Sequence, residues 1–148
     1  MRFSRILMIG LVACMLGAAG MAGCASSNDN IPVAAMPSGE TFSGLWRTNF
    51  GDMKLTQNSD GTVKGTFDYK TGGEIEGTVE GGVLKFAWRQ PGDFQVGRRE
   101  VAGHGYLVIT IVDDETVCKG EWGYAGNYTG GGDWHGTKAK EIYRKKDM

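Results

Sequence analysis

Apolar and polar residues alternate with a period of two along most of the chain after Thr41. Residues 62–69 and 73–80 show the pattern most clearly, with Val63 and Ile75 each set between polar neighbours. Such alternation is typical of antiparallel strands that have one buried and one solvent-exposed face. Turn-forming Gly, Asn and Asp separate the segments at roughly ten-residue intervals. The pattern predicts eight strands, over residues 42–49, 51–57, 62–69, 73–80, 83–89, 104–112, 116–124 and 134–143.

The chain after Thr41 shows no amphipathic helical pattern that could form a crossover between strands. Residues 58–61 and 81–82 have the Asn and Gly composition of hairpin turns. Successive hairpins predict an all-β fold, an eight-stranded antiparallel up-and-down (meander) β-barrel, because closure removes exposed strand edges. Glycines at inward positions of the pattern (Gly65, Gly77 and Gly120) fit the tight curvature of a small barrel.

The first 24 residues have a different character. Arg2 and Arg5 precede an apolar run from Ile6 to Leu16, and small residues then lead to Cys24. This order of basic, apolar and small residues is typical of a secretory signal. The box Met21-Ala22-Gly23-Cys24 resembles that of bacterial lipoproteins, and ordinary secretion is the alternative.

The lipoprotein resemblance implies cleavage before Cys24, with diacylglycerol on its sulfur and a fatty acid such as palmitate on its amine. Ala25 follows the cysteine, which in lipoproteins of diderm bacteria implies sorting to the outer membrane. We therefore expect a signal peptide over 1–23, a flexible tether over 24–40, and a barrel domain over 41–148 that faces the periplasm or the cell surface.

Charge and cysteine content narrow the function classes. The chain has 16 basic and 17 acidic residues. Two of the basic residues and none of the acidic ones lie in residues 1–23, so the remainder is net acidic. An acidic domain argues against a nucleic-acid partner. Cys118 is the only cysteine in the barrel domain, so the domain has no internal disulfide.

Four segments, in order along residues 41–144, carry a likeness to a known group. They are Gly44-Leu45-Trp46, Val63 to Phe67, Leu84 to Arg89 and Lys119 to Tyr124. Together they resemble the calycin barrels, and most closely the avidins. The resemblance implies an eight-stranded meander that takes a small hydrophobic or heterocyclic ligand in its open end. It also implies that Trp46 packs under a last-strand arginine, Arg144, at the closed end.

The biotin site of the avidins is mostly unmatched. Thr48 and Asp52 stand where avidins have an asparagine and a serine around the first turn. Phe67 replaces a tyrosine, and Cys118 replaces a stacking tryptophan. Trp88 is the one aromatic wall residue that matches the avidin site in residue type. A polar site without its matched donors loses orders of magnitude in affinity. We therefore do not expect biotin as the ligand.

Two groups of aromatic residues are candidate binding residues. Phe67, Phe86, Trp88 and Trp122 either line a ligand cavity or fill the core, since a barrel of this size holds side chains or one small ligand. The glycine-rich segment 124–135 adds further candidates. We predict ligand or partner contacts from Trp88, Tyr124, Asn127, Tyr128 and Trp134; alternatively, the aromatics of this segment fold back onto the barrel mouth.

Motifs for catalysis or metal binding are weak. The domain has two histidines, His104 and His135, and no nucleophile motif of recognisable spacing. Asp113-Asp114-Glu115 reads as a solvated turn. Zinc needs three or four converging ligands, so we expect neither a metal site nor a cofactor. Asp93, Glu121 and Asp133 leave a carboxylate-dependent glycoside hydrolase open as a minor alternative.

The expected protein is thus a non-enzymatic envelope lipoprotein. It binds a small ligand or a partner through the barrel mouth and the 124–135 segment. The alternative is an inhibitor of an envelope enzyme, or a structural lipoprotein, with a filled barrel.

Overall fold

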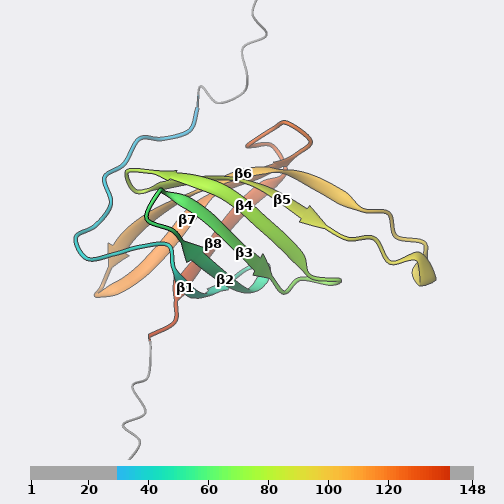
Figure 1. The fold of residues 1–148 in the computed structure, drawn as a ribbon, viewed down its shortest axis with the longest axis horizontal. Helices are drawn as coiled ribbons and strands as arrows, with labels where there is room; N and C mark the ends of the chain where they lie inside the picture. The colour runs from blue at the N-terminus through green and yellow to red at the C-terminus, as the bar shows by residue number, and fades with distance from the viewer. Residues whose placement is uncertain (1–29, 141–148) are drawn as a thin grey trace, which may run out of the picture.

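The computed structural model describes residues 30–140, and these form one sheet that closes on itself (Figure 1). The strands are β1 (Gly44–Thr48), β2 (Gly51–Gln57), β3 (Thr62–Phe67), β4 (Gly73–Glu80), β5 (Val83–Gln90), β6 (Val101–Val112), β7 (Glu115–Tyr124) and β8 (Gly132–Lys138). A single turn of 3₁₀ helix (Phe94–Val96) lies between β5 and β6.

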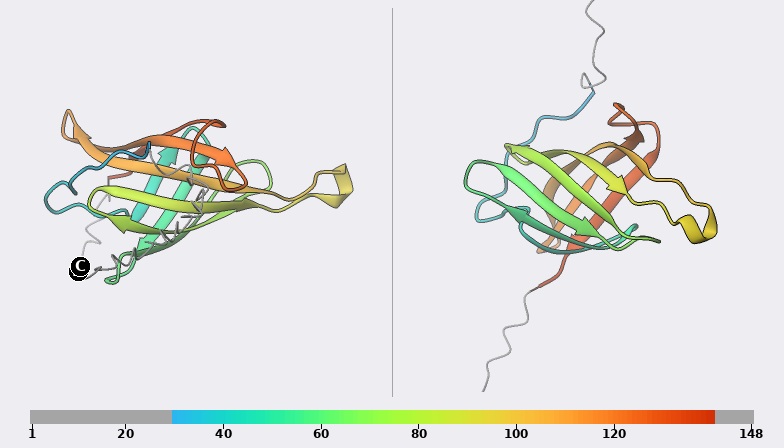
Figure 2. Two further views of the ribbon diagram at one scale, coloured as in Figure 1. Left: turned by 90° about the horizontal axis from the view of Figure 1, so that it is seen from above. Right: turned by 45° about the vertical axis from the view of Figure 1, so that its right-hand side comes forward.

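Each strand pairs antiparallel with the next, and β8 returns to pair with β1. Figure 2 shows the resulting cylinder from two further sides. The closing pair aligns Trp46 with Lys138, and Thr48 with Gly136. The backbone amide of Ala139 extends this strand pairing by donating a hydrogen bond to the carbonyl of Leu45 at 2.8 Å. The predicted fold class, an eight-stranded antiparallel meander barrel, is confirmed.

Most predicted strand limits lie within two residues of the observed ones, and two limits differ by more. β6 begins at Val101 rather than at residue 104, because the β5–β6 pairing runs on to Gln90 and Val101. β8 ends at Lys138, five residues before the predicted end. Arg144, the predicted partner of Trp46, lies outside the described residues, as do Cys24 and the signal segment.

Inward-facing apolar side chains fill the barrel over most of its length. Alternate positions of β2 and β3 are buried, as the period-two pattern predicts: Met53, Leu55, Val63 and Phe67 are all 5 % exposed or less. The tight curvature at inward glycines is also confirmed. A Cβ atom on Gly120 would lie 1.8 Å from the carbonyl oxygen of Tyr106 across the ladder.

One end of the barrel is sealed by the segment that precedes β1. Phe42 is fully buried, and its carbonyl accepts a hydrogen bond from the indole of Trp46 at 2.9 Å. The ammonium of Lys138 lies 5.5 Å from the Trp46 ring centroid and pairs with Glu40 at 3.2 Å. A lysine from β8 thus covers Trp46.

This packing begins before the predicted domain boundary at residue 41. The carbonyl of Ala34 accepts a hydrogen bond from the Gly82 amide at 2.8 Å, and Met36 packs against the core. The second half of the predicted tether is therefore part of the closed end. Its path along the barrel is the blue segment of Figure 1.

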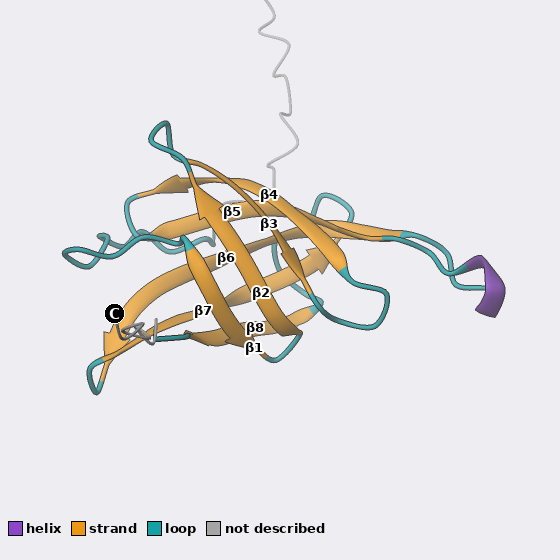
Figure 3. Cartoon of the chain, turned by 60° about the horizontal axis from the view of Figure 1, so that its bottom comes forward, coloured by secondary structure: helices purple, strands orange, loops and turns teal. Residues whose placement is uncertain are grey.

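The other end of the barrel is open. The turns β1–β2, β3–β4, β5–β6 and β7–β8 all lie there, because alternate connections of a meander share one end. Figure 3 shows the longest of them, the β5–β6 hairpin, extending well beyond the body of the barrel with its helical turn at the tip. We call this end the mouth. Among residues 30–140, no helix is long and apolar enough to cross a membrane.

Candidate functional site

The mouth holds a cavity of about 390 Å³. Its floor is formed by side chains from inside the barrel, and its rim by residues of three of the four turns at this end. The lining residues are Phe50, Phe67, Tyr69, Lys70, Thr71, Trp88, Gln90, Pro91, Arg98, Arg99, Val101, Trp122, Tyr124 and Trp134. The volume lies in the ~300–1,000 Å³ range of small-molecule sites.

Aromatic rings make up most of the wall, and they contact one another edge to face. Trp134 rises from the floor, with Phe50, Phe67 and Phe86 at centroid distances of 4.9–5.3 Å. Trp88, Trp122 and Tyr124 form a second group, with distances of 5.1–5.9 Å. Interlocked rings of this kind give the cavity a rigid apolar wall.

The tight β1–β2 turn positions Phe50 at the junction of these groups. The hydroxyl of Thr48 accepts a hydrogen bond from the Phe50 amide at 3.0 Å and donates to the Gly51 carbonyl at 2.7 Å. Asn49 ties the same turn to β8: its side chain donates to the Asp133 carbonyl and accepts from the His135 amide, both at 2.9 Å. The Phe50 ring therefore lies at a fixed place against Tyr69 and Trp122.

Two indole N–H groups of the wall have no hydrogen-bond acceptor among the described residues. They belong to Trp122 and Trp134, and both nitrogen atoms are shielded from solvent. A buried donor without an acceptor costs about 1–3 kcal/mol. The third indole of the wall differs, since Trp88 donates to the His104 carbonyl at 3.2 Å. Two of the tryptophans that line the cavity thus have indole N–H groups without a hydrogen-bond acceptor among the described residues.

The charged side chains of the cavity lining are all cationic. Lys70, from the β3–β4 turn, places its ammonium 4.9 Å from the Tyr69 ring centroid. Arg98 and Arg99 come from the β5–β6 hairpin. No carboxylate of residues 30–140 lines the cavity. The cavity lining is therefore positive, although the chain as a whole has a formal net charge of −1.

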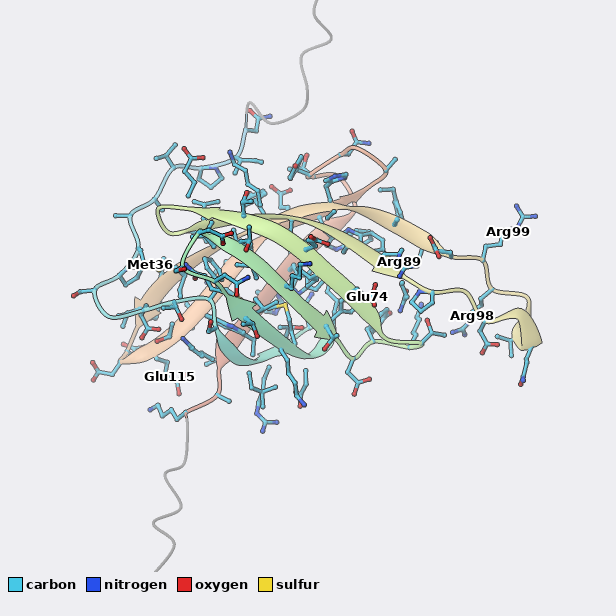
Figure 4. The ribbon with its side chains drawn as sticks, viewed as in Figure 1. Met36, Glu74, Arg89, Arg98, Arg99 and Glu115 are labelled. Carbon is cyan, nitrogen blue, oxygen red and sulfur yellow. The ribbon has the colours of Figure 1, made fainter. Side chains whose placement is uncertain are left out.

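The nearby carboxylates at the base of the hairpin already have partners. Arg89 donates to Glu74 at 2.7 Å and to Glu100 at 3.2 Å. Figure 4 shows Arg89 beside Glu74 on the barrel body and both Arg98 and Arg99 farther out on the hairpin. Asp93 accepts a hydrogen bond from the backbone amide of Gln95.

The structure divides the predicted binding residues into two sets. Trp88, Tyr124 and Trp134 line the mouth cavity, where Tyr124 is 57 % exposed and Trp134 is only 3 % exposed. Asn127 and Tyr128 do not line it. Tyr128 lies against His104 on β6, with ring centroids 5.0 Å apart, and His104 in turn contacts the Ala125 carbonyl through Nδ1.

Several residues of the cavity lining were not predicted from the sequence. Phe50, Tyr69, Lys70 and Arg98 belong to three different turns, so no local motif marks them. One signal was available: alternate turns of a meander converge at one end, and these turns contain aromatic and basic residues. Of the four aromatic residues that were expected to line a cavity or fill the core, Phe67, Trp88 and Trp122 line the mouth cavity, whereas Phe86 is buried in the filled core below it.

The carboxylates of the hydrolase alternative do not line the mouth cavity. Glu121 lies opposite Asp133 in the β7–β8 ladder and accepts a hydrogen bond from the Tyr106 hydroxyl at 2.9 Å. Asp93 lies on the projecting hairpin instead. No group of three or more His, Cys, Asp or Glu residues in the described part of the chain is arranged to hold a metal ion.

The interpretation of Asp113-Asp114-Glu115 as a solvated turn is confirmed, since all three residues are exposed. Asp113 and Asp114 form the exposed β6–β7 turn, both with positive φ, as a tight hairpin requires. Cys118 is fully buried in β7, and burial raises the pKa of its thiol to about 12. Such a thiol stays protonated and unreactive at neutral pH.

No protein-family model, curated protein or solved structure matches the chain. The candidate site therefore rests on its own geometry.

Proposed function

We propose that this protein is a non-enzymatic binding protein that takes a small, largely aromatic ligand in the mouth of its barrel. One observation carries the proposal: an otherwise filled barrel opens at one end into a cavity of about 390 Å³ walled by eight apolar or aromatic side chains and Pro91. Cavities of this size with mostly apolar walls and few polar groups are the usual form of small-molecule sites.

Tryptophan fluorescence offers a direct test. Three of the four tryptophans line the cavity, and the fourth, Trp46, lies at the closed end. Titration with the neutral probe N-phenyl-1-naphthylamine should therefore quench most of the emission by energy transfer while probe fluorescence rises. Absence of saturable binding would contradict the proposal.

A pair of matched variants locates the probe. Tyr124 lines the cavity and is 57 % exposed, whereas Ile111 is 52 % exposed on the β6–β7 hairpin at the opposite end. Tyr124→Ala should weaken probe binding about fivefold, since losing one aromatic contact is worth ~1 kcal/mol. Ile111→Ala should leave the affinity unchanged. Equal effects of the two variants would place the probe elsewhere.

We further propose that the domain is presented from the outer membrane by lipid on Cys24. The described chain supports an anchor that holds the closed end of the barrel toward the lipid. Ala34 is fixed at the closed end by its bond to Gly82, and the ten residues from there to Cys24 reach at most about 36 Å. The mouth at the opposite end would then face away from the lipid.

The anchor is tested by replacing Cys24 and following palmitate incorporation. Cys24→Ser should abolish labelling and release the protein from the membrane fraction, because stable anchoring depends on the acyl chains. Cys14→Ser, at the other signal-segment cysteine, is the matched control and should keep the label. Labelling that survives Cys24→Ser would refute the anchor.

A second candidate function is inhibition of an envelope enzyme through the projecting β5–β6 hairpin. The hairpin favours it, because it stands clear of the barrel and exposes Val96 to 63 % (Figure 3). Replacing residues 94–97, between the paired Asp93 and Arg98, by a two-residue Asn-Gly turn distinguishes the candidates. Inhibitor activity against a periplasmic lysozyme or protease would be lost, whereas binding of the neutral probe would persist.

A further inference from the structure

We infer that the mouth selects ligands that carry an anionic group beside their aromatic portion, and that Lys70 and Arg98 bind that group. This inference rests on the proposed function and adds the chemical class of the ligand. Its basis is an asymmetry of charge: the cavity lining holds three cations and no carboxylate, in a chain that is net acidic.

The cations of the mouth are available to a ligand. Within residues 30–140, six ion pairs form between basic and acidic side chains, and none involves Lys70, Arg98 or Arg99. Arg89, at the base of the β5–β6 hairpin, is held by Glu74 and Glu100. The structure thus separates one arginine used to brace the hairpin base from cations that line the cavity.

The position of these cations sets the position of the anionic group. Lys70 lies in the β3–β4 turn and Arg98 in the β5–β6 hairpin, so the two approach the cavity from neighbouring parts of the rim. In the view of Figure 4, Arg98 extends back toward the barrel and Arg99 extends away from it. A ligand with its rings against Trp88 and Trp122 would carry its charge outward, at the rim.

Lys70 and Arg98 are both exposed at the rim, and such cations favour an anion over a neutral ligand. A carboxylate, sulfonate or phosphate at the rim keeps part of its hydration while it gains charge-assisted hydrogen bonds. The deep wall is suited to the uncharged portion, because it is formed by the rings of Phe67, Trp88, Trp122 and Trp134. The ligand class is therefore a small aromatic acid.

Two probes that differ in one group test this directly. N-Phenyl-1-naphthylamine and 8-anilinonaphthalene-1-sulfonate share the same rings, and only the second carries a sulfonate. The double variant Lys70→Gln/Arg98→Gln should weaken binding of the sulfonate about tenfold, which is ~1.4 kcal/mol. It should change binding of the neutral probe by less than about twofold. Raising NaCl from about 0.02 to about 0.5 M should weaken binding of the sulfonate probe only, because salt screens its interaction with the cations.

Lys119→Gln is the matched control, since it removes one exposed cation from the outer face of β7, away from the mouth cavity. It should leave both affinities unchanged. Equal losses for both probes in the double variant, or no loss for either, would overturn the inference while leaving the proposed function intact. Failure of both probes to bind the unaltered protein would overturn the proposed function, and the inference with it.

Discussion

At the scale of single residues, the outer surface of the barrel contains a tyrosine with unusual chemistry. Tyr106 is only 8 % exposed, although it alternates with the inward side chains of β6. Burial raises the pKa of its hydroxyl to about 12, and the hydrogen bond to Glu121 adds to the effect. A phenolate at this place would lose hydration and would meet the Glu121 carboxylate.

The first prediction concerns the alkaline titration of Tyr106. Its folded pKa lies above the unfolded value near 10, so its contribution to stability is complete below about pH 10 and is lost as the pH rises toward 12. Between pH 9 and pH 11, the unaltered protein should lose about 1 kcal/mol more unfolding free energy than Tyr106→Phe. Urea unfolding at the two pH values measures this difference.

Glu121→Gln supplies the control for that titration. Removing the charge should move the Tyr106 pKa partway back toward its ordinary value, because burial persists while the repulsion is gone. Absorbance near 295 nm follows the phenolate directly. A Tyr106 that titrates with the exposed tyrosines in the unaltered protein would contradict the assignment.

At the scale of elements, hairpins are joined so closely that some positions admit only glycine. Gly120 faces Leu107 across the β6–β7 ladder, and an added Cβ would lie 1.8 Å from the Tyr106 carbonyl oxygen. The obstacle is backbone rather than a side chain that can rotate away. The two strands would have to separate locally, which weakens the longest strand pairing of the barrel.

The second prediction follows from that contact. Gly120→Ala should lower the free energy of unfolding by about 3 kcal/mol, as overpacking against fixed atoms does. Gly126→Ala is the matched control in the β7–β8 turn, where an added Cβ meets nothing within 4 Å. Its effect should stay within about 0.5 kcal/mol. Denaturant unfolding of both variants measures these free energies. Similar values for the two variants would contradict the prediction and would mean that β6 and β7 separate at Gly120 at little cost.

The elements were predictable from sequence because their signals are local. Strands β2 and β4 have the predicted limits, since alternation and turn glycines lie within a few residues of each other. The site was less predictable. Trp88 and Tyr124 were expected to bind, but Phe50, Tyr69, Lys70 and Arg98 converge only through closure of the barrel. Asn127 and Tyr128 lie outside the cavity because Tyr128 contacts His104 instead.

At the scale of the whole molecule, the two ends of the barrel differ: one is closed and the other is open. The segment before β1 seals one end through Phe42 and the Glu40–Lys138 pair. The turns at the other end leave the aromatic cavity open. Since Trp134 fills the middle of the barrel, the ends are separated by packed core, and changes at one should not reach the other.

The last prediction tests this separation with one variant at each end. Phe42 is fully buried at the seal, so Phe42→Ala should cost about 3–5 kcal/mol of unfolding free energy. The neutral probe should still bind with unchanged affinity wherever the variant is folded. Tyr124→Ala should do the opposite: affinity falls, while stability changes by about 1 kcal/mol or less, because 57 % of Tyr124 is already exposed. Chemical denaturation and probe titration on the same samples give both readouts. If Phe42→Ala weakened binding in its folded state, the cavity would depend on the seal, and the barrel would behave as one coupled unit.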